Sequence, residues 1–313
     1  MRSARLLGAL ALGLLVLLIA LWFSPDPDPQ EAWQARKGSL ASIRVREKGP
    51  GPEGLTRSLL TLESTSGLSV DVGVLAPDEG PSRHPGVLLL AGNAAGDRAI
   101  DEAVNVEGVV TLALGYSYVP PSGAGPFEDL LEVPRARRAF MDVVPSALLA
   151  HDYLLGRGDV APSRIALVGV SFGALYVPVV ASQDHRFAAA VMVEGGGDLP
   201  ALLRRNIALA GAGRLASVGG LVGGRLVRPL EPLRYASAIA PVPLVMINAT
   251  GDALVPPESA RALFEAAREP KELVWLEAEH VHLGDPKLLK RVADAVAEAL
   301  AKRGILKARD FRG

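Results

Sequence analysis

Cysteine is absent from the 313 residues of this chain. Its absence excludes disulfide bonds, thiolate metal sites, a cysteine nucleophile and the acylated cysteine of a lipoprotein anchor. An excess of charge is also lacking, because 33 basic and 34 acidic residues leave a net charge of −1. No run of Lys or Arg forms a binding stripe, so nothing in the sequence indicates a nucleic-acid partner.

Hydrophobic residues are abundant at 49%, and the chain is long enough for one large α/β domain with additional segments. Its first feature is an unbroken apolar run over residues 6–23, which follows Arg2 and Arg5. The run has the length of a short membrane span, and its end, LWFSP, is a poor cleavage site. We therefore predict a signal anchor over residues 1–23, with the rest of the chain on the extracytoplasmic side. The alternative is a signal peptide that is cleaved to give a secreted protein.

Prolines alternate with aspartates directly after the apolar run, over residues 24–29. Such a sequence is typical of a stiff, solvated spacer. We therefore predict a Pro/Asp-rich linker over residues 24–37 and a folded domain over residues 38–313.

Short apolar or alternating segments of the strand type recur along the domain and alternate with helical patterns. The expected strands are 43–46, 59–62, 68–75, 86–91, 109–114, 165–168, 188–193, 243–247 and 273–276. The expected helices are 146–155, 174–182, 258–268 and 286–303. This order predicts an α/β fold with a mostly parallel central sheet, helices on both faces and an antiparallel edge formed by the first strands.

One segment, residues 199–234, interrupts the alternation and is rich in Gly, Ala, Leu and Arg. It lies between two expected core strands. We predict a small helical cap that packs over a site and whose glycines allow movement.

The strongest motif is Gly169-Val-Ser171-Phe-Gly173, a G-x-S-x-G sequence between an expected strand and an expected helix. A nucleophilic serine requires this tight strand-to-helix turn, in which only glycine fits two positions before and after it. The motif predicts Ser171 as the nucleophile, with Gly169 and Gly173 as the glycines of the turn. The alternative is a glycine-rich turn that only packs or binds phosphate at a helix N-terminus.

A serine hydroxyl needs a base and an orienting acid, which follow in the chain order Ser, Asp or Glu, His. Asp252 lies just past the expected strand 243–247 and is the preferred acid, with Glu194 as the competitor. His280 is the preferred base because it is the first histidine after the last strand, with His282 as the alternative.

A metal site is a further possibility near the chain end, where His280 and His282 are two residues apart and Asp285 follows. More ligands would be needed, so we predict no metal site. The remaining histidines, His84, His151 and His185, are expected to be surface or packing residues.

An oxyanion hole needs two backbone N–H donors. One is expected from Phe172, which follows the nucleophile. The other is expected from the loop after strand 86–91, with Asn93 as the first candidate and Ala94 as the second.

Three segments resemble known enzymes: residues 159–173 (DVAPSRIALVGVSFG), 184–187 (DHRF) and 251–256 (GDALVP). Together with the His280 loop before a terminal helix, they are similar to α/β hydrolases of the dienelactone-hydrolase-like and prolyl-oligopeptidase-like branches. The resemblance extends over roughly residues 55–303. It implies the α/β-hydrolase fold and Ser171, Asp252 and His280 as a catalytic triad.

The chain also departs from that family pattern. Ala91-Gly92 stands where His-Gly is usual, and Ala278-Glu279 precedes His280 where two glycines are usual. The chain lacks a propeller domain and has Ser in place of a Cys nucleophile, so it is expected to be neither a true oligopeptidase nor a dienelactone hydrolase itself.

These observations predict a serine hydrolase that cleaves a small-molecule carboxylic ester or thioester through an acyl-enzyme, without a cofactor. An acyltransferase with the same triad is one alternative. A membrane-tethered binding protein that kept the fold and lost catalysis is another.

Overall fold

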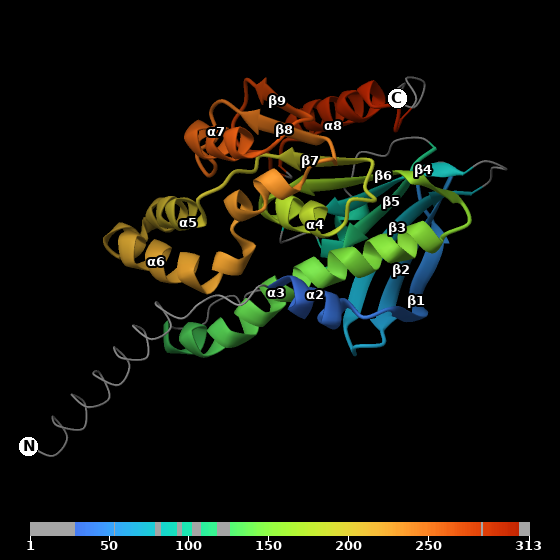
Figure 1. Ribbon diagram of the computed structural model, residues 1–313, viewed down its shortest axis with the longest axis horizontal. Helices are drawn as coiled ribbons and strands as arrows, with labels where there is room; N and C mark the ends of the chain where they lie inside the picture. Colours follow the sequence, from blue (N-terminus) through green and yellow to red (C-terminus); the bar gives the residue numbers. More distant parts are fainter. Residues whose placement is uncertain are drawn as a thin grey trace, which may run out of the picture.

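A computed structural model describes residues 29–52, 54–78, 83–92, 96–101, 108–117, 126–282 and 284–306. The predicted anchor over residues 1–23 and the predicted oxyanion residue Asn93 lie outside these ranges. Figure 1 shows the fold, in which a twisted sheet has helices packed on both sides.

Nine strands form one sheet in the order β1-β2-β3-β5-β4-β6-β7-β8-β9. The strands are β1 (Leu40–Pro50), β2 (Leu55–Ser64), β3 (Ser69–Pro77), β4 (His84–Leu90), β5 (Val110–Leu114), β6 (Val160–Val170), β7 (Ala189–Val193), β8 (Leu244–Ala249) and β9 (Lys271–Leu276). From β1 to β5 the neighbours are antiparallel, and from β5 to β9 they are parallel. The predicted mostly parallel sheet with an antiparallel edge is therefore confirmed.

Alternate side chains of the parallel strands enter two separate hydrophobic cores. In β8, Leu244 and Met246 belong to the core on one face, whereas Val245 and Ile247 belong to the core on the other. Successive residues of a strand point to opposite faces, so a continuously apolar strand has to be covered on both. This is why the unbroken apolar runs of the sequence became central strands.

Seven helices in the described residues complete the fold. They are α2 (Pro29–Lys37), α3 (Pro126–Gly156), α4 (Val177–Gln183), α5 (Leu199–Ile207), α6 (Gly213–Leu226), α7 (Pro257–Ala266) and α8 (Pro286–Lys302). Helices α3 and α4 pack on one face of the sheet, and α8 packs on the other (Figure 1).

Helix α3 is much longer than the expected helix over residues 146–155, because it continues through Pro145 and Pro134. Proline lacks the N–H of a helical hydrogen bond and usually ends a helix. Here Val143 and Val144 before Pro145, and Ala147 and Leu148 after it, are all buried in the same core. Tertiary packing therefore holds the helix together where local propensity would end it.

Part of the predicted linker is folded, which differs from the extended spacer expected there. Residues 29–37 form α2, which packs beside α3. Trp33 is only 4% exposed and belongs to the main hydrophobic core. Arg36 and Lys37 form ion pairs with Asp142 and Asp152 of α3. The helix was not predicted from the Pro/Asp-rich composition, because it is stabilised by the burial of one large aromatic side chain, Trp33.

The predicted insertion lies between β7 and β8 and consists of α5, α6 and three short 3₁₀ turns, at Arg228–Leu230, Pro232–Arg234 and Ala236–Ala238. Within the described ranges, one stretch, Leu199–Leu226, is long and apolar enough by composition to cross a membrane. It is not a straight helix, because Gly211 adopts φ 88° between α5 and α6. We refer to residues 199–226 as the cap hairpin.

Candidate active site

Ser171 lies at the sharp turn between β6 and the 3₁₀ helix Ser171–Tyr176 that leads into α4. Its φ is 53°, a left-handed conformation that is unfavourable for a residue with a Cβ. The turn carries the serine past the carboxyl end of the parallel strands. Strain of this kind, held by the surrounding structure, is typical of a functional residue.

The glycines on either side of Ser171 are required by close backbone contacts. A Cβ on Gly173 would lie 1.9 Å from the carbonyl oxygen of Leu90, and a Cβ on Gly169 would lie 2.6 Å from that of Gly173. No side chain fits at such distances without moving β4 or the turn itself. The packing of this turn therefore leaves room only for glycine at both positions.

Three residues from distant parts of the chain form a continuous hydrogen-bonded chain. Oγ of Ser171 lies 2.7 Å from Nε2 of His280, and Nδ1 of His280 lies 2.7 Å from Oδ2 of Asp252. Asp252 is buried, and its other oxygen, Oδ1, accepts hydrogen bonds from the N–H groups of Leu254 and Val255. These bonds fix the carboxylate so that it orients the imidazole.

His282, the alternative base, is exposed and does not take part in this chain of hydrogen bonds. Asp285, the third member of the metal site considered from the sequence, caps the N-terminus of α8 through the N–H groups of Lys287 and Leu288. The structure therefore brings His280 to Ser171 and leaves His282 and Asp285 outside the cluster.

Glu194 is a fourth member of the cluster, although the sequence presented it only as a rival of Asp252. It follows β7 directly with φ 52°, and its side chain is buried. Its Oε2 lies 3.1 Å from Nδ1 of His280 and accepts a hydrogen bond from the N–H of Val281 at 2.6 Å. The imidazole is thus flanked by two carboxylates, one from the end of β7 and one from the loop after β8.

The two acids change the protonation equilibria of the cluster. Burial raises the pKa of Glu194 to about 7, and the charge of Asp252 adds to the rise, against the hydrogen bond from Val281 and the attraction of His280. Burial alone would lower the pKa of His280. The hydrogen bond to Asp252 and the charges of Glu194 and Asp252 outweigh burial and raise that pKa above 6.5.

Glu194, Asp252 and His280 also offer ligand atoms within 4.8 Å of one another, which is a possible metal-binding geometry. However, both contacts of Nδ1, at 2.7 and 3.1 Å, have the length of N–H···O hydrogen bonds. Two oxygens of the trio already accept backbone N–H groups. This arrangement suits a proton on Nδ1 better than a metal ion between the three groups.

Phe172, the predicted first oxyanion donor, directly follows the nucleophile in the turn, and its ring packs edge-on against Tyr116 and Tyr176. The second predicted donor, Asn93, lies outside the described residues. The strand end that leads to it is held by Tyr116, whose hydroxyl donates to the carbonyl oxygen of Ala91 at 2.6 Å. Tyr116 was not predicted as a site residue from the sequence, although its position just past the carboxyl end of a parallel strand is where ligand-binding residues lie in this type of sheet.

The cap hairpin contacts the loop that carries Asp252. The guanidinium of Arg205 donates to the carbonyl oxygen of Ala253, and the side-chain amide of Asn206 donates to that of Leu254. Helix α5 therefore holds the residues next to the acid of the cluster.

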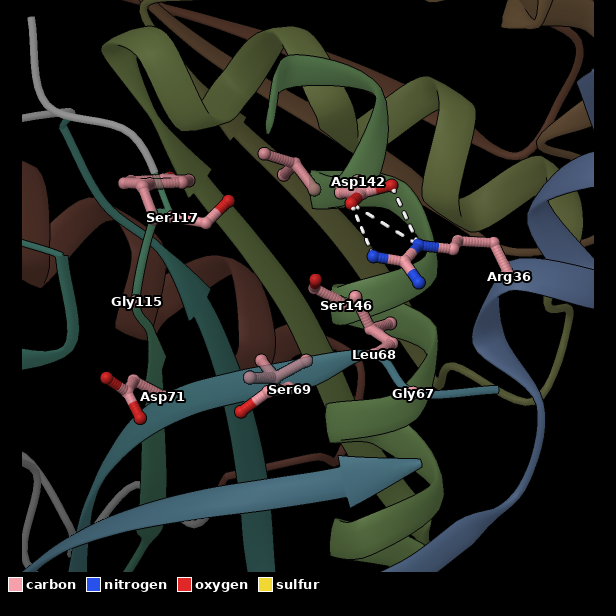
Figure 2. A pocket seen from close by; sticks show the side chains of 12 residues that line it. Arg36, Gly67, Leu68, Ser69, Asp71, Gly115, Ser117, Asp142 and Ser146 are labelled. Carbon is pink, nitrogen blue, oxygen red and sulfur yellow. Dashed lines mark hydrogen bonds and ion pairs between the residues drawn. The ribbon is translucent and has the colours of Figure 1, made fainter. Parts of the chain in front are cut away.

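A cavity of about 300 Å³ opens at the same sheet edge, on the side of α2 and α3 (Figure 2). Its lining combines polar and apolar side chains in similar measure and includes Ser69, Asp71, Ser117 and Ser146, with the Arg36–Asp142 ion pair at one wall. Of its lining residues, Tyr116 also contacts Phe172, which connects the cavity to the turn of Ser171.

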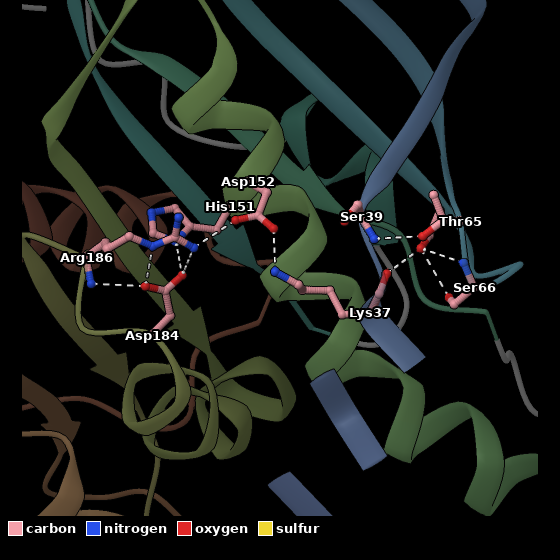
Figure 3. A network of polar contacts seen from close by, with 9 residues as sticks. Lys37, Ser39, Thr65, Ser66, His151, Asp152, Asp184 and Arg186 are labelled. Carbon is pink, nitrogen blue, oxygen red and sulfur yellow. Dashed lines mark hydrogen bonds and ion pairs between the residues drawn. The ribbon is translucent and has the colours of Figure 1, made fainter. Parts of the chain in front are cut away.

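The other histidines have structural surroundings, as the sequence predicted. His151 is fully buried, stacks on Phe187 with ring centroids 3.7 Å apart, and lies 2.8 Å from Asp184. Arg186 continues this network to Asp152 of α3, as Figure 3 shows. His84 contacts the carbonyl oxygen of Gly108, and His185 contacts that of Ala238.

Solved structures with the same architecture share this arrangement of strands and helices. Acetyl xylan esterase 1 from Thermoanaerobacterium sp. JW/SL YS485 superposes with a TM-score of 0.65 over 89% of this chain and 95% of its own, at 12% identity. This is the α/β-hydrolase fold. The acetyl xylan esterase from Paenibacillus sp. R4 gives a TM-score of 0.63 over 89% and 99%, at 17% identity. Methylesterase BT1017 gives 0.60 over 91% and 62%, at 20% identity.

Sequence comparisons reach less far than the structural ones. No family model matches the chain. The uncharacterized protein YfhR of Escherichia coli K12 is 28% identical over 127 residues, and that of strain O157:H7 is 25% identical over 126. Each match covers 40% of this chain and 41% of the relative. The particular hydrolase branch therefore stays a prediction.

Proposed function

We propose that this α/β-hydrolase-fold protein is a serine hydrolase that cleaves a carboxylic ester or thioester through an acyl-enzyme. The observation that carries the proposal is the continuous hydrogen-bonded chain Ser171–His280–Asp252, with both links at 2.7 Å and the serine on a strained turn. Several proteins of the same fold, including two acetyl xylan esterases and a methylesterase, are named as esterases, which supports an ester as substrate.

In the proposed first step, Oγ of Ser171 attacks the substrate carbonyl while Nε2 of His280 takes its proton. Asp252 keeps the other ring proton on Nδ1 and stabilises the imidazolium that forms. The N–H of Phe172 and an N–H from the loop at Asn93 would bind the oxyanion. The intermediate then collapses with cleavage of the C–O or C–S bond of the substrate, and His280 protonates the leaving group.

In the proposed second step, His280 takes a proton from water, and the resulting hydroxide attacks the acyl carbonyl. Collapse of this intermediate breaks the ester bond to Ser171, and His280 returns its proton to the serine oxygen. If another hydroxyl or amine replaced water, the same residues would transfer the acyl group instead of hydrolysing it.

We also propose that residues 1–23 anchor the protein to a membrane, with the folded domain outside the cytoplasm. The apolar run of residues 6–23 and the two arginines before it support this orientation. Carbonate extraction of membranes would leave an anchored protein in the pellet, whereas a cleaved and secreted protein would be recovered without these residues.

The catalytic proposal is tested by labelling the full chain, in detergent micelles, with a fluorophosphonate probe. We expect strong labelling of the wild type, none of Ser171→Ala, and loss of at least about 100-fold in the labelling rate of His280→Ala. His282→Ala is the matched control and should label like the wild type. A folded wild type that does not label would overturn the proposal.

A further inference from the structure

The cap hairpin presents an apolar face that no described part of the protein covers. Among the described residues, eight large hydrophobic side chains are exposed, and five of them lie on this hairpin. They are Leu209, Leu215, Val218, Leu221 and Val222, with exposed fractions between 40% and 66%. Leu254, which α5 holds through Asn206, extends the same exposed group from the Asp252 loop.

Packing inside the hairpin explains why this face points outward. The opposite side of α6 carries glycines that lie against α5, and a Cβ on Gly220 or Gly224 would come within 2.7 Å of Pro200. The glycine side of α6 is therefore buried against α5. Leu215, Val218 and Val222, which are three and four residues apart, fall on the other side.

Neither helix of the hairpin is long enough by itself to cross a membrane, although residues 199–226 together have the length and composition of a span. Helix α6 has 14 residues and α5 has 9, and Gly211 separates them. At about 1.5 Å per residue, neither helix spans the roughly 30 Å of a hydrocarbon core. An amphipathic pair of this size is suited to lie in the plane of a membrane interface.

Charge identifies the kind of surface that the hairpin would meet. Residues 199–230 contain five arginines and no acidic residue, although the whole chain has a net charge of −1. Arg204, Arg205, Arg214 and Arg228 are exposed. The acids that flank this segment in the sequence, Asp198 and Glu231, accept hydrogen bonds from backbone N–H groups at the start of α5. This pattern is complementary to anionic lipid headgroups.

The position of the chain before α2 brings the hairpin close to a bilayer, an argument that rests on the proposed anchor. Five residues separate Phe23 from Pro29, and they can span at most about 20 Å. Trp33 of α2 lies 6.1 Å, between ring centroids, from Tyr235, whose hydroxyl donates to the carbonyl of Pro229 just after the hairpin. Helix α2, to which the anchor leads, therefore lies next to the segment that follows the hairpin.

We propose that the cap hairpin docks on the surface of a bilayer containing anionic phospholipid, with Leu215, Val218 and Leu221 at the boundary between headgroups and acyl chains. Arg204 and Arg214 contact the headgroups. Because α5 is bonded to the Asp252 loop, docking places the region beside Ser171 next to the membrane, where amphiphilic esters collect.

The absence of cysteine allows a direct test in the full chain. A polarity-sensitive fluorophore is attached to Val218→Cys, and to Val45→Cys as the matched control. Val45 is a valine of similar exposure, 57% against 62%, on the distant edge strand β1. The proteins are reconstituted into phosphatidylcholine vesicles with or without phosphatidylglycerol, and some vesicles carry lipids brominated on their acyl chains.

We expect a blue shift and bromine quenching of the label at position 218 in anionic vesicles, and neither at position 45. Replacing Arg204 and Arg214 by Gln in the labelled protein should weaken docking by a factor of about 30, because each arginine near an anionic surface contributes about fivefold. Emission from position 218 that equals that from position 45 in anionic vesicles would overturn the proposal. So would a blue shift in detergent alone that grows with protein concentration, because it would indicate a second copy on this face.

Vesicle flotation separates failure of the anchor from failure of docking. Protein that floats with anionic vesicles and is released by 1 M salt, at which the Debye length is about 3 Å, lacks an anchor but docks as proposed. Protein that floats in high salt yet shows water-like emission at position 218 is anchored and does not dock. The labelling of Ser171 is independent of both results.

Discussion

Glu194 Oε2 lies 3.1 Å from Nδ1 of His280, the same nitrogen that lies 2.7 Å from Asp252. The base of the candidate site is therefore held between two buried carboxylates on two different strand ends. One acid is sufficient to orient an imidazole, so the second one has to affect either its protonation or its position. Three predictions distinguish these effects.

Replacing Glu194 by Gln should shift the pH dependence of activity. The charge of Glu194 helps to raise the pKa of His280, so its removal lowers that pKa. Because the base must be neutral, the acid limb of kcat/KM for p-nitrophenyl acetate is expected to move to lower pH by about 0.5–1 unit. Glu279→Gln, an exposed neighbour of His280, is the matched control and should leave the limb in place. A purely structural Glu194 would lower kcat at every pH without moving the limb.

Glu194 should also make the folded protein less stable at alkaline pH. Its pKa is about 7 in the folded protein against 4.5 ordinarily, so the folded state binds its proton more tightly. The resulting stabilisation is complete below pH 4.5 and is lost as pH rises through 7, with a magnitude of about 3 kcal/mol. Gln at position 194 resembles the protonated acid and lacks this dependence. Denaturant unfolding at pH 5 and pH 8 should therefore show a larger fall for the wild type, and equal falls would contradict the prediction.

Asp252→Asn should reduce activity less than the same replacement does in a triad that has only one acid. Loss of the acid in a Ser-His-Asp triad reduces kcat about 10⁴-fold, because the imidazole adopts the wrong tautomer. Here Glu194 can still accept the Nδ1 proton, so we expect a loss of about 10²–10³-fold. The double variant with Glu194→Gln should lose about 10⁴-fold, as a triad without any acid does. Stopped-flow acylation measurements would separate this effect from slow deacylation, and an additive double variant would show that Glu194 does not substitute.

Much of the fold could be predicted because its determinants are local in the sequence. Short unbroken apolar runs, such as residues 243–247 and 188–193, indicate strands that are covered on both faces. The G-x-S-x-G motif indicates a tight strand-to-helix turn. Two features depended on distant contacts instead. Helix α3 passes Pro145 because both sides of the proline are buried, and α2 forms because Trp33 reaches the core.

The candidate site shows the same division. Ser171, His280 and Asp252 follow from motif and chain order, and the structure brings them together. The participation of Glu194 could not be predicted, because sequence reasoning treated two acids at strand ends as alternatives. Whether both reach one nitrogen depends on the separation of β7 and β8 and on the left-handed backbone of Glu194, and neither is visible in the residue pattern.

Trp33→Ala should destabilise the domain by about 3–5 kcal/mol, the usual cost of removing a buried aromatic side chain. Trp33 is 4% exposed and contacts Tyr235, so the cavity would open between α2 and the segment that follows the cap hairpin. Trp275→Ala, at a half-buried tryptophan of β9 under Arg261, is the control and should cost clearly less. Denaturant unfolding of the full chain in detergent measures both. A change for Trp33→Ala within about 0.5 kcal/mol of wild type would mean that residues 29–37 act as the free spacer that their composition suggests.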